Sequence, residues 1–239
     1  MVKLIVKQLL RRLGKTRIKG YTLIAQKYKP MLRLLDELGR RGVDVPSLDA
    51  LEIFGSDGLD HTTTYADRVR TLEVWEIDEN LRPRLGENLP KASIRIADSY
   101  TEVTQTAKRF DFVVIDNPIG PYGAHCDHFG LFPDKVFWIA RDRCILVLDV
   151  IPRIERVTLK HFPELIEKDY LERRKQFYGA EDAMHIPIER MAARYRGFAE
   201  QNGFRVIWSF HIKRSDAGVH YLVLGIRKYQ AAGWLLTRP

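Results

Sequence analysis

The segments ALEIFGSDG at residues 50–58 and TLEVWEID at residues 71–78 are the strongest indication of the fold. In each segment a short apolar run ends in glycine or acidic residues, as a buried strand does when it runs into a turn. The residues between the two segments carry a helical pattern. A strand followed by a helix and a second strand is the unit of a parallel sheet, so this region predicts a β-α-β unit.

The same alternation continues along the chain. Five buried strands are expected, at residues 50–55, 71–77, 93–97, 112–116 and 144–150. A charged helix is expected over residues 158–178, and another over residues 187–201. Two further strands, at residues 204–212 and 219–227, flank a turn and are typical of an antiparallel hairpin. The predicted fold is α/β: a doubly wound, mostly parallel seven-stranded sheet with a terminal antiparallel hairpin and N-terminal helices.

The basic charge is concentrated near the N-terminus. The chain of 239 residues has a formal net charge of +8, and every residue before Asp36 that is charged at neutral pH is basic, so the remainder is close to neutral. A nucleic-acid-binding domain usually carries its basic excess on the body of the fold. We expect residues 1–46 to form a basic amphipathic helical extension and residues 47–239 the α/β domain. Residues 152–186 exceed the usual length of a connection and are expected to form a lid or a substrate-binding insertion.

Apolar residues within residues 1–13 fall on one helical stripe, opposite a basic face. Such a helix either lies on an anionic membrane surface or packs against the body of its own protein. No apolar run reaches the ~18 residues needed to span a bilayer. Two cysteines, Cys126 and Cys144, make no disulfide framework. The expected location is cytoplasmic, with residues 1–13 as the candidate contact to the inner face of the membrane.

Acidic residues follow the carboxyl ends of successive predicted strands. Glu76, Asp98, Asp116 and Asp149 end the second to fifth strands. In an open α/β sheet, ligands bind along this edge, and an acid ~20 residues after the glycine loop is placed to accept hydrogen bonds from ribose hydroxyls. Each acid alone is typical of a helix N-cap. Their recurrence at successive strand ends indicates a ligand site.

In these segments the chain resembles the class I S-adenosylmethionine-dependent methyltransferases. The resemblance covers about residues 48–227, through the glycine loop after an LE-type strand, VWEID, IADS, VVIDNP and the final hairpin. It implies a Rossmann-like methyltransferase fold and S-adenosylmethionine as cofactor. The implied cofactor-binding residues are Glu52, Gly55, Ser56 and Gly58 around the methionine part, Glu76 at the ribose hydroxyls, and Asp98 at the adenine amino group. The loop departs from the usual form because Phe54 and Ser56 replace two glycines.

The resemblance also implies that Asp116 faces the transferred methyl group. The residues after the expected catalytic loop add a second expectation: His125 or His128 faces the substrate and takes the hydroxyl proton as a general base, since histidine titrates near neutral pH. The LEI strand with Gly58 is similar to the cation-dependent O-methyltransferases, which implies a Mg²⁺ ion shared by Asp116 and Asp149. That subclass has Asp-Asn at the end of the fifth strand, where this chain has Asp149-Val150. The expected reaction is O-methylation of a sugar, glycan or small hydroxylated acceptor.

Other interpretations remain open. The segment DNPI at residues 116–119 is a degenerate form of the motif of nucleic-acid amino-group methyltransferases, although Ile119 lacks a base-stacking surface. A non-catalytic binding module with the same fold is a further alternative. The segment HCDH at residues 125–128 is either a zinc site or a helix start capped by Asp127. A Rossmann dehydrogenase is disfavoured because the G-x-G-x-x-G fingerprint is missing.

Overall fold

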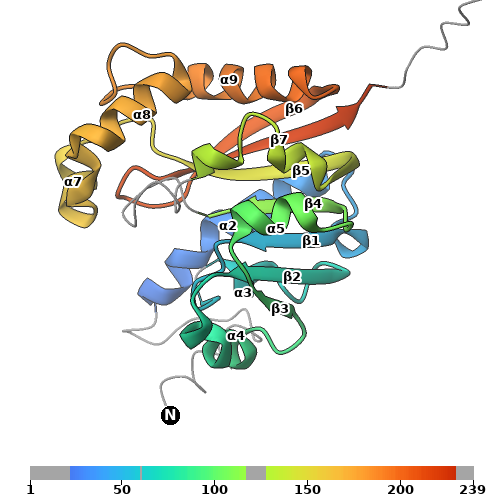
Figure 1. Ribbon diagram of the computed structural model, residues 1–239. Coiled ribbons are helices and arrows are strands. Elements are labelled where there is room, and N and C mark those ends of the chain that lie inside the picture. The colour runs from blue at the N-terminus through green and yellow to red at the C-terminus, as the bar shows by residue number, and fades with distance from the viewer. Residues whose placement is uncertain (1–21, 60, 117–127, 230–239) are drawn as a thin grey trace, which may run out of the picture.

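The computed structural model describes residues 22–59, 61–116 and 128–229 of the chain. Its centre is a seven-stranded sheet in the order β3-β2-β1-β4-β5-β7-β6, in which β3 and β6 form the two edges (Figure 1). β1 to β5 pair in parallel, and β7 is antiparallel to both of its neighbours. The predicted doubly wound sheet with a terminal hairpin is confirmed. The strands are β1 (Asp49–Ile53), β2 (Thr71–Glu76), β3 (Ser93–Ile96), β4 (Phe110–Ile115), β5 (Ala140–Val150), β6 (Phe204–Lys213) and β7 (His220–Lys228).

Helices cover both faces of this sheet. One buried apolar cluster joins α2, α3 and α4 to one face, and a second joins α5, α6, α8 and α9 to the other. The fold is therefore a three-layer α/β/α sandwich. The helices are α2 (Thr22–Arg40), α3 (Thr62–Tyr65), α4 (Arg82–Asn88), α5 (Ser99–Gln105), α6 (Lys135–Trp138), α7 (Arg156–His161), α8 (Lys168–Tyr178) and α9 (Ile188–Gln201).

The parallel register decides which side chains share a face. Glu52 of β1 pairs with Val114 of β4, which in turn pairs with Val147 of β5. Because side chains alternate along a strand, Asp116 and Asp149, each two residues further on, point to the same face as Glu52. That face is the one covered by α2 and α3. The register thus gathers three acids at the carboxyl ends of three adjacent strands.

Part of the segment predicted as an extension packs against the sheet. Met31, Leu34 and Leu38 of α2 are fully buried in the cluster on the α2–α3 face. Residues 1–13 lie outside the described residues, and their contact with a membrane stays a prediction. Within the described part of the chain, no helix is both long and apolar enough to cross a membrane.

The single charged helix predicted over residues 158–178 is wrong. The structure has α7, then a 3₁₀ turn at Pro163–Ile166, and then α8. Pro163 explains the break, because it has no backbone N–H and its ring clashes with a preceding helical turn. The buried guanidinium of Arg174 fastens α8 to the end of β5 by donating to the carbonyls of Ala183 (2.8 Å) and Ile151.

At the amino ends of the strands, one ion-pair network ties β1 to its neighbours. Asp49 accepts hydrogen bonds from Arg70 Nε (2.8 Å) and Nη2 (2.6 Å), from Thr71 Oγ1 (2.7 Å) and from Arg141 Nη2 (2.7 Å). The hydrogen bonds from Arg70 are the main reason that the pKa of Asp49 lies well below its usual range. Partial burial acts in the opposite direction, and the hydrogen bonds from Thr71 and Arg141 lower the pKa further.

This network predicts an acid-sensitive contribution to stability. A carboxyl group whose pKa is lowered on folding stabilises the protein above its unfolded pKa of about 4, and the contribution is lost as pH falls toward the folded value. Asp49→Asn should lower the free energy of unfolding at neutral pH by about 1 kcal/mol, a modest value because solvent screens part of the pair. It should also flatten the decline below about pH 4 in urea titrations. An unchanged acid profile would contradict this assignment.

Candidate functional site

The loop after β1 adopts glycine-like conformations without glycine at two positions. Phe54 and Ser56 have φ values of 65° and 48°, and Gly58 has 69°. Phe54 and Ser56 are the residues that replace the usual glycines, so the loop keeps the left-handed backbone at a conformational cost. Gly55 is required for space, because a Cβ there would lie 2.2 Å from Val74 Cγ1.

Glu76 holds this loop from the end of β2. Its Oε2 accepts from the backbone N–H of Ser56 at 2.6 Å, and its Oε1 accepts from that of Asp78 at 2.9 Å. Each carboxylate oxygen can still accept a second hydrogen bond. The next residue, Ile77, is an apolar side chain that is 62% exposed at the same edge. A carboxylate beside an exposed apolar side chain suits a nucleoside, which combines hydroxyls with a flat ring.

Asp98 lies at the end of β3 and caps α5. It accepts hydrogen bonds from the backbone N–H of Tyr100 (3.0 Å) and from Thr101 Oγ1 (2.9 Å). The glycine loop, Glu76 and Asp98 therefore lie at the carboxyl ends of β1, β2 and β3, which are adjacent in the sheet. The structure brings together the residues predicted to bind the cofactor, except Glu52.

Glu52 points instead into the layer between the sheet and α3. It is 1% exposed, its Oε1 lies 2.8 Å from Nε2 of His61, and its Oε2 accepts from the hydroxyl of Tyr65. Burial and the charge of Glu52 raise the pKa of Tyr65 well above its usual value, which keeps this phenol protonated as a donor. Glu52 thus fixes α3 against β1.

His61 links Glu52 to Asp116. Its Nδ1 lies 3.5 Å from Asp116 Oδ2, and the ring is almost completely buried. Burial alone would lower the pKa of His61, but the charges of Asp116 and Glu52 and the hydrogen bond to Glu52 outweigh it, so the pKa is raised. We infer that His61 helps to balance negative charge at this edge of the sheet.

Arg214 completes the cluster from the β6–β7 turn. Its guanidinium forms ion pairs with Asp116 at the end of β4 and with Asp149 near the end of β5. At Asp116 and Asp149, where the sequence predicts a Mg²⁺ site, a side chain of the protein balances the charge of the acid pair. Arg214 lies 65 residues after Asp149 in the sequence, and the antiparallel hairpin brings it to the acids. No local sequence pattern indicates this contact.

The general base predicted at His128 is wrong. His128 is fully buried on the opposite face of the sheet, where it hydrogen-bonds to the hydroxyl of Tyr195 and packs against Phe129 and Phe132. The residues that follow His128, such as Phe129 and Leu131, are buried in the core, so His128 lies in the core as well and not beside the acids. His125, Cys126 and Asp127, which belong to the alternative zinc site, lie outside the described residues.

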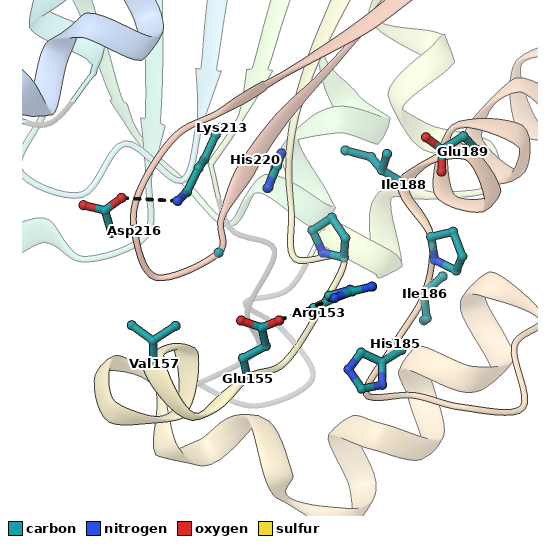
Figure 2. A pocket seen from close by; sticks show the side chains of 13 residues that line it. Arg153, Glu155, Val157, His185, Ile186, Ile188, Glu189, Lys213, Asp216 and His220 are labelled. Carbon is teal, nitrogen blue, oxygen red and sulfur yellow. Dashed lines mark ion pairs between the residues drawn. The ribbon is translucent and has the colours of Figure 1, made fainter.

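A pocket of about 550 Å³ lies at the same end of the sheet, between the segment after β5, the segment before α9 and the β6–β7 turn (Figure 2). The charged side chains around it include two internal ion pairs. Lys213 lies 3.3 Å from Asp216, and Arg153 lies 3.8 Å from Glu155. Apolar side chains such as Ile186 complete the wall. The pocket suits a small molecule with both polar and apolar parts.

His220 lines this pocket from the first position of β7 (Figure 2). Burial, together with His211 and Lys213, lowers its pKa, so the imidazole is neutral at neutral pH. Its Nδ1 is buried and has no hydrogen-bond partner among the described residues. The next residue along β7, Tyr221, pairs with Asp149, which places the pocket beside the charged cluster.

Comparison with solved structures shows the same architecture in methyltransferases. Magnesium protoporphyrin IX methyltransferase from Synechocystis PCC 6803, solved with bound SAH, aligns with 95% of this chain and 100% of its own, at a TM-score of 0.54 and 14% identity. The chain has the class I methyltransferase fold. A putative sarcosine dimethylglycine methyltransferase from Galdieria sulphuraria aligns with 84% of this chain and 85% of its own, at a TM-score of 0.51 and 12% identity. No family model and no curated protein matches the sequence.

Within this methyltransferase fold, His61 and Arg214 belong to the charged cluster, and the sequence analysis assigned neither of them to it. His61 follows the glycine loop by three residues, so its position near the edge was a usable signal. Arg214 had no such signal, because its role depends on the register of the hairpin against β5.

The strained loop predicts a stabilising substitution. Ser56→Gly removes a left-handed serine that costs about 1–2 kcal/mol, against about 0.5–1 kcal/mol of added chain entropy in the unfolded state. The free energy of unfolding should rise by up to about 1 kcal/mol in urea titrations, since glycine keeps the N–H that Glu76 accepts. Ser56→Ala is the control and should give no gain. Equal effects of the two substitutions would count against backbone strain.

The buried position of His128 predicts a structural role. His128→Ala should lower the free energy of unfolding by about 2–4 kcal/mol, because it leaves a cavity and removes the bond to Tyr195. His161→Ala, at an exposed position, is the matched control and should change stability by less than about 0.5 kcal/mol. If both variants unfold at the same urea concentration as the wild type, the core assignment of His128 fails.

Proposed function

We propose that the protein is an S-adenosylmethionine-dependent methyltransferase. The observation that carries the proposal is the edge formed by the left-handed loop after β1, the Glu76 carboxylate that binds this loop, and the exposed Ile77 beside it. This edge lies where an open α/β sheet binds nucleotides. The shared methyltransferase fold supports the same proposal.

The residues present fit the cofactor. Glu76 retains acceptor capacity for the two ribose hydroxyls, Ile77 offers an apolar surface to the adenine ring, and Asp98 lies on the neighbouring strand end. The loop at residues 54–58 would border the methionine part. Its close packing on β2 at Gly55 keeps the backbone fixed, so little ordering is needed on binding.

The cofactor, when bound, supplies a methyl group on a sulfonium that is already reactive. The protein then has to align the acceptor and handle its proton. Asp116 lies at the end of the central strand β4 and is held by Arg214 on one side, with His61 on the other. We propose that Asp116 orients the nucleophile of the acceptor by accepting its hydrogen bond. A carboxylate held by two neighbours is already in place before the acceptor binds.

The proposed acceptor is a small hydroxylated molecule, such as a sugar or the end of a glycan, and the proposed reaction is O-methylation. The pocket beside the cluster supports this, because its carboxylates and histidines can bond hydroxyls and Ile186 and Ile188 offer an apolar surface to a ring. The cations Lys213 and Arg153 are paired with acids in the pocket. A phosphate backbone would therefore find little unbalanced positive charge there, which disfavours the nucleic-acid alternative.

Binding of S-adenosylhomocysteine, measured by calorimetry, tests the proposal. The wild type should bind one equivalent with a micromolar Kd, and Glu76→Gln should weaken binding by about 10-fold or more because one acceptor oxygen becomes a donor. Glu79→Gln, three residues further on and exposed, is the matched control and should bind as the wild type does.

Two results would overturn the proposal. Failure of the folded wild type to bind S-adenosylhomocysteine would leave the fold as a non-catalytic binding module. Binding that Glu76→Gln and Glu79→Gln weaken equally would remove Glu76 from the nucleoside site. NADH serves as the comparison ligand and should not bind, since the dinucleotide fingerprint is missing.

A further inference from the structure

Contacts within its own hairpin hold Arg214 beside the two acids. It directly follows β6, its backbone N–H donates to the carbonyl of Val219 at 2.8 Å, and its guanidinium lies 5.5 Å from the ring centre of Tyr221. The side chain is 18% exposed. The hairpin therefore presents one largely buried positive charge to the carboxyl ends of β4 and β5.

The acid pair depends on this charge. Asp149 is 1% exposed, and its carboxylate accepts no hydrogen bond from any other residue in the described part of the chain. β4 and β5 are adjacent strands, and Ile115 of β4 pairs with Leu148 of β5. Asp116 directly follows Ile115, and Asp149 directly follows Leu148, so the two acids occupy the next matching position on the two strands. Two carboxylates held this close, with water excluded from one of them, repel each other unless they share a proton or a cation balances their charge. Here the guanidinium of Arg214, ion-paired to both, supplies that charge.

We propose that Arg214 is a built-in cation that occupies the place of a divalent metal ion between Asp116 and Asp149. Oxygen ligands from two adjacent strand ends are the donors that Mg²⁺ or Mn²⁺ would use. A guanidinium meets the same oxygens through its planar fork of donors, and it cannot be lost to a chelator or by deprotonation. If the proposed function holds, Arg214 also positions Asp116. The replacement of a metal ion by the guanidinium of Arg214 does not itself depend on that function.

The proposal predicts that removing Arg214 uncovers a metal site. Mn²⁺ is the probe, because it takes oxygen ligands as Mg²⁺ does and its binding is measured by electron paramagnetic resonance. Arg214→Ala should bind one Mn²⁺ per chain at least about 100-fold more tightly than the wild type. Saturating Mn²⁺ should raise the Tm of this variant and leave the Tm of the wild type unchanged.

Two variants separate this effect from a general loss of an arginine. Arg214→Ala combined with Asp149→Asn lacks one of the two carboxylates and should bind Mn²⁺ no better than the wild type. Arg95→Ala removes an arginine that pairs at 2.7 Å with a single buried acid, Glu102, and should not create a site either. Only the variant that leaves both carboxylates without their guanidinium should gain the ion.

Tight Mn²⁺ binding by the wild type, or equal binding by Arg214→Ala and the double variant, would overturn the proposal. If Arg214→Ala does not fold alone, Mn²⁺ must restore its circular dichroism spectrum; failure to do so while the double variant folds would also overturn it. Affinity for S-adenosylhomocysteine is measured in parallel, so loss of the proposed function is seen separately from loss of the metal effect.

Discussion

Buried negative charge at one edge of the sheet has to be balanced by neighbouring side chains, and this requirement shapes the whole site. The parallel register places Glu52, Asp116 and Asp149 on the same face of three adjacent strands. Carboxylates with so little access to water are stable only beside cations or strong donors. Tyr65 comes from α3, His61 from the position just before α3, and Arg214 from the β6–β7 turn. The acids therefore determine where α3 and the β6–β7 turn must dock.

Much of the fold could be predicted because its signals are local. Apolar runs that end in Gly55, Glu76, Asp98 or Asp116 mark strands and their carboxyl ends, and a parallel sheet brings those ends together whatever the details of packing. The order of the elements then fixed the doubly wound topology and the terminal hairpin. Pro163 is a sequence signal for the break between α7 and α8. The charged helical pattern on both sides of Pro163 nevertheless favours a single helix, which is why the break was not predicted.

The partners within the site could not be predicted in the same way. Whether Asp116 and Asp149 bind a metal ion or a guanidinium depends on which residue of the β6–β7 turn reaches them, and that is set by hairpin register and by the packing of Tyr221. His128 is the opposite case. Its position after the predicted catalytic loop favours a functional role, but it packs with Phe129 and Phe132 on the opposite face of the sheet. Tertiary contacts decide both cases.

The loop after β1 has a consequence for how such folds diverge. Phe54 and Ser56 keep left-handed backbone angles that glycine would adopt at less cost, because Glu76 and the tight fit of Gly55 against Val74 hold the loop from outside. Once an anchor of that kind exists, glycine at the neighbouring positions is no longer indispensable, and mutation can replace it at a tolerable loss of stability. A protein can therefore keep the backbone shape of a nucleotide-binding turn after other residues have replaced the glycines of its sequence motif.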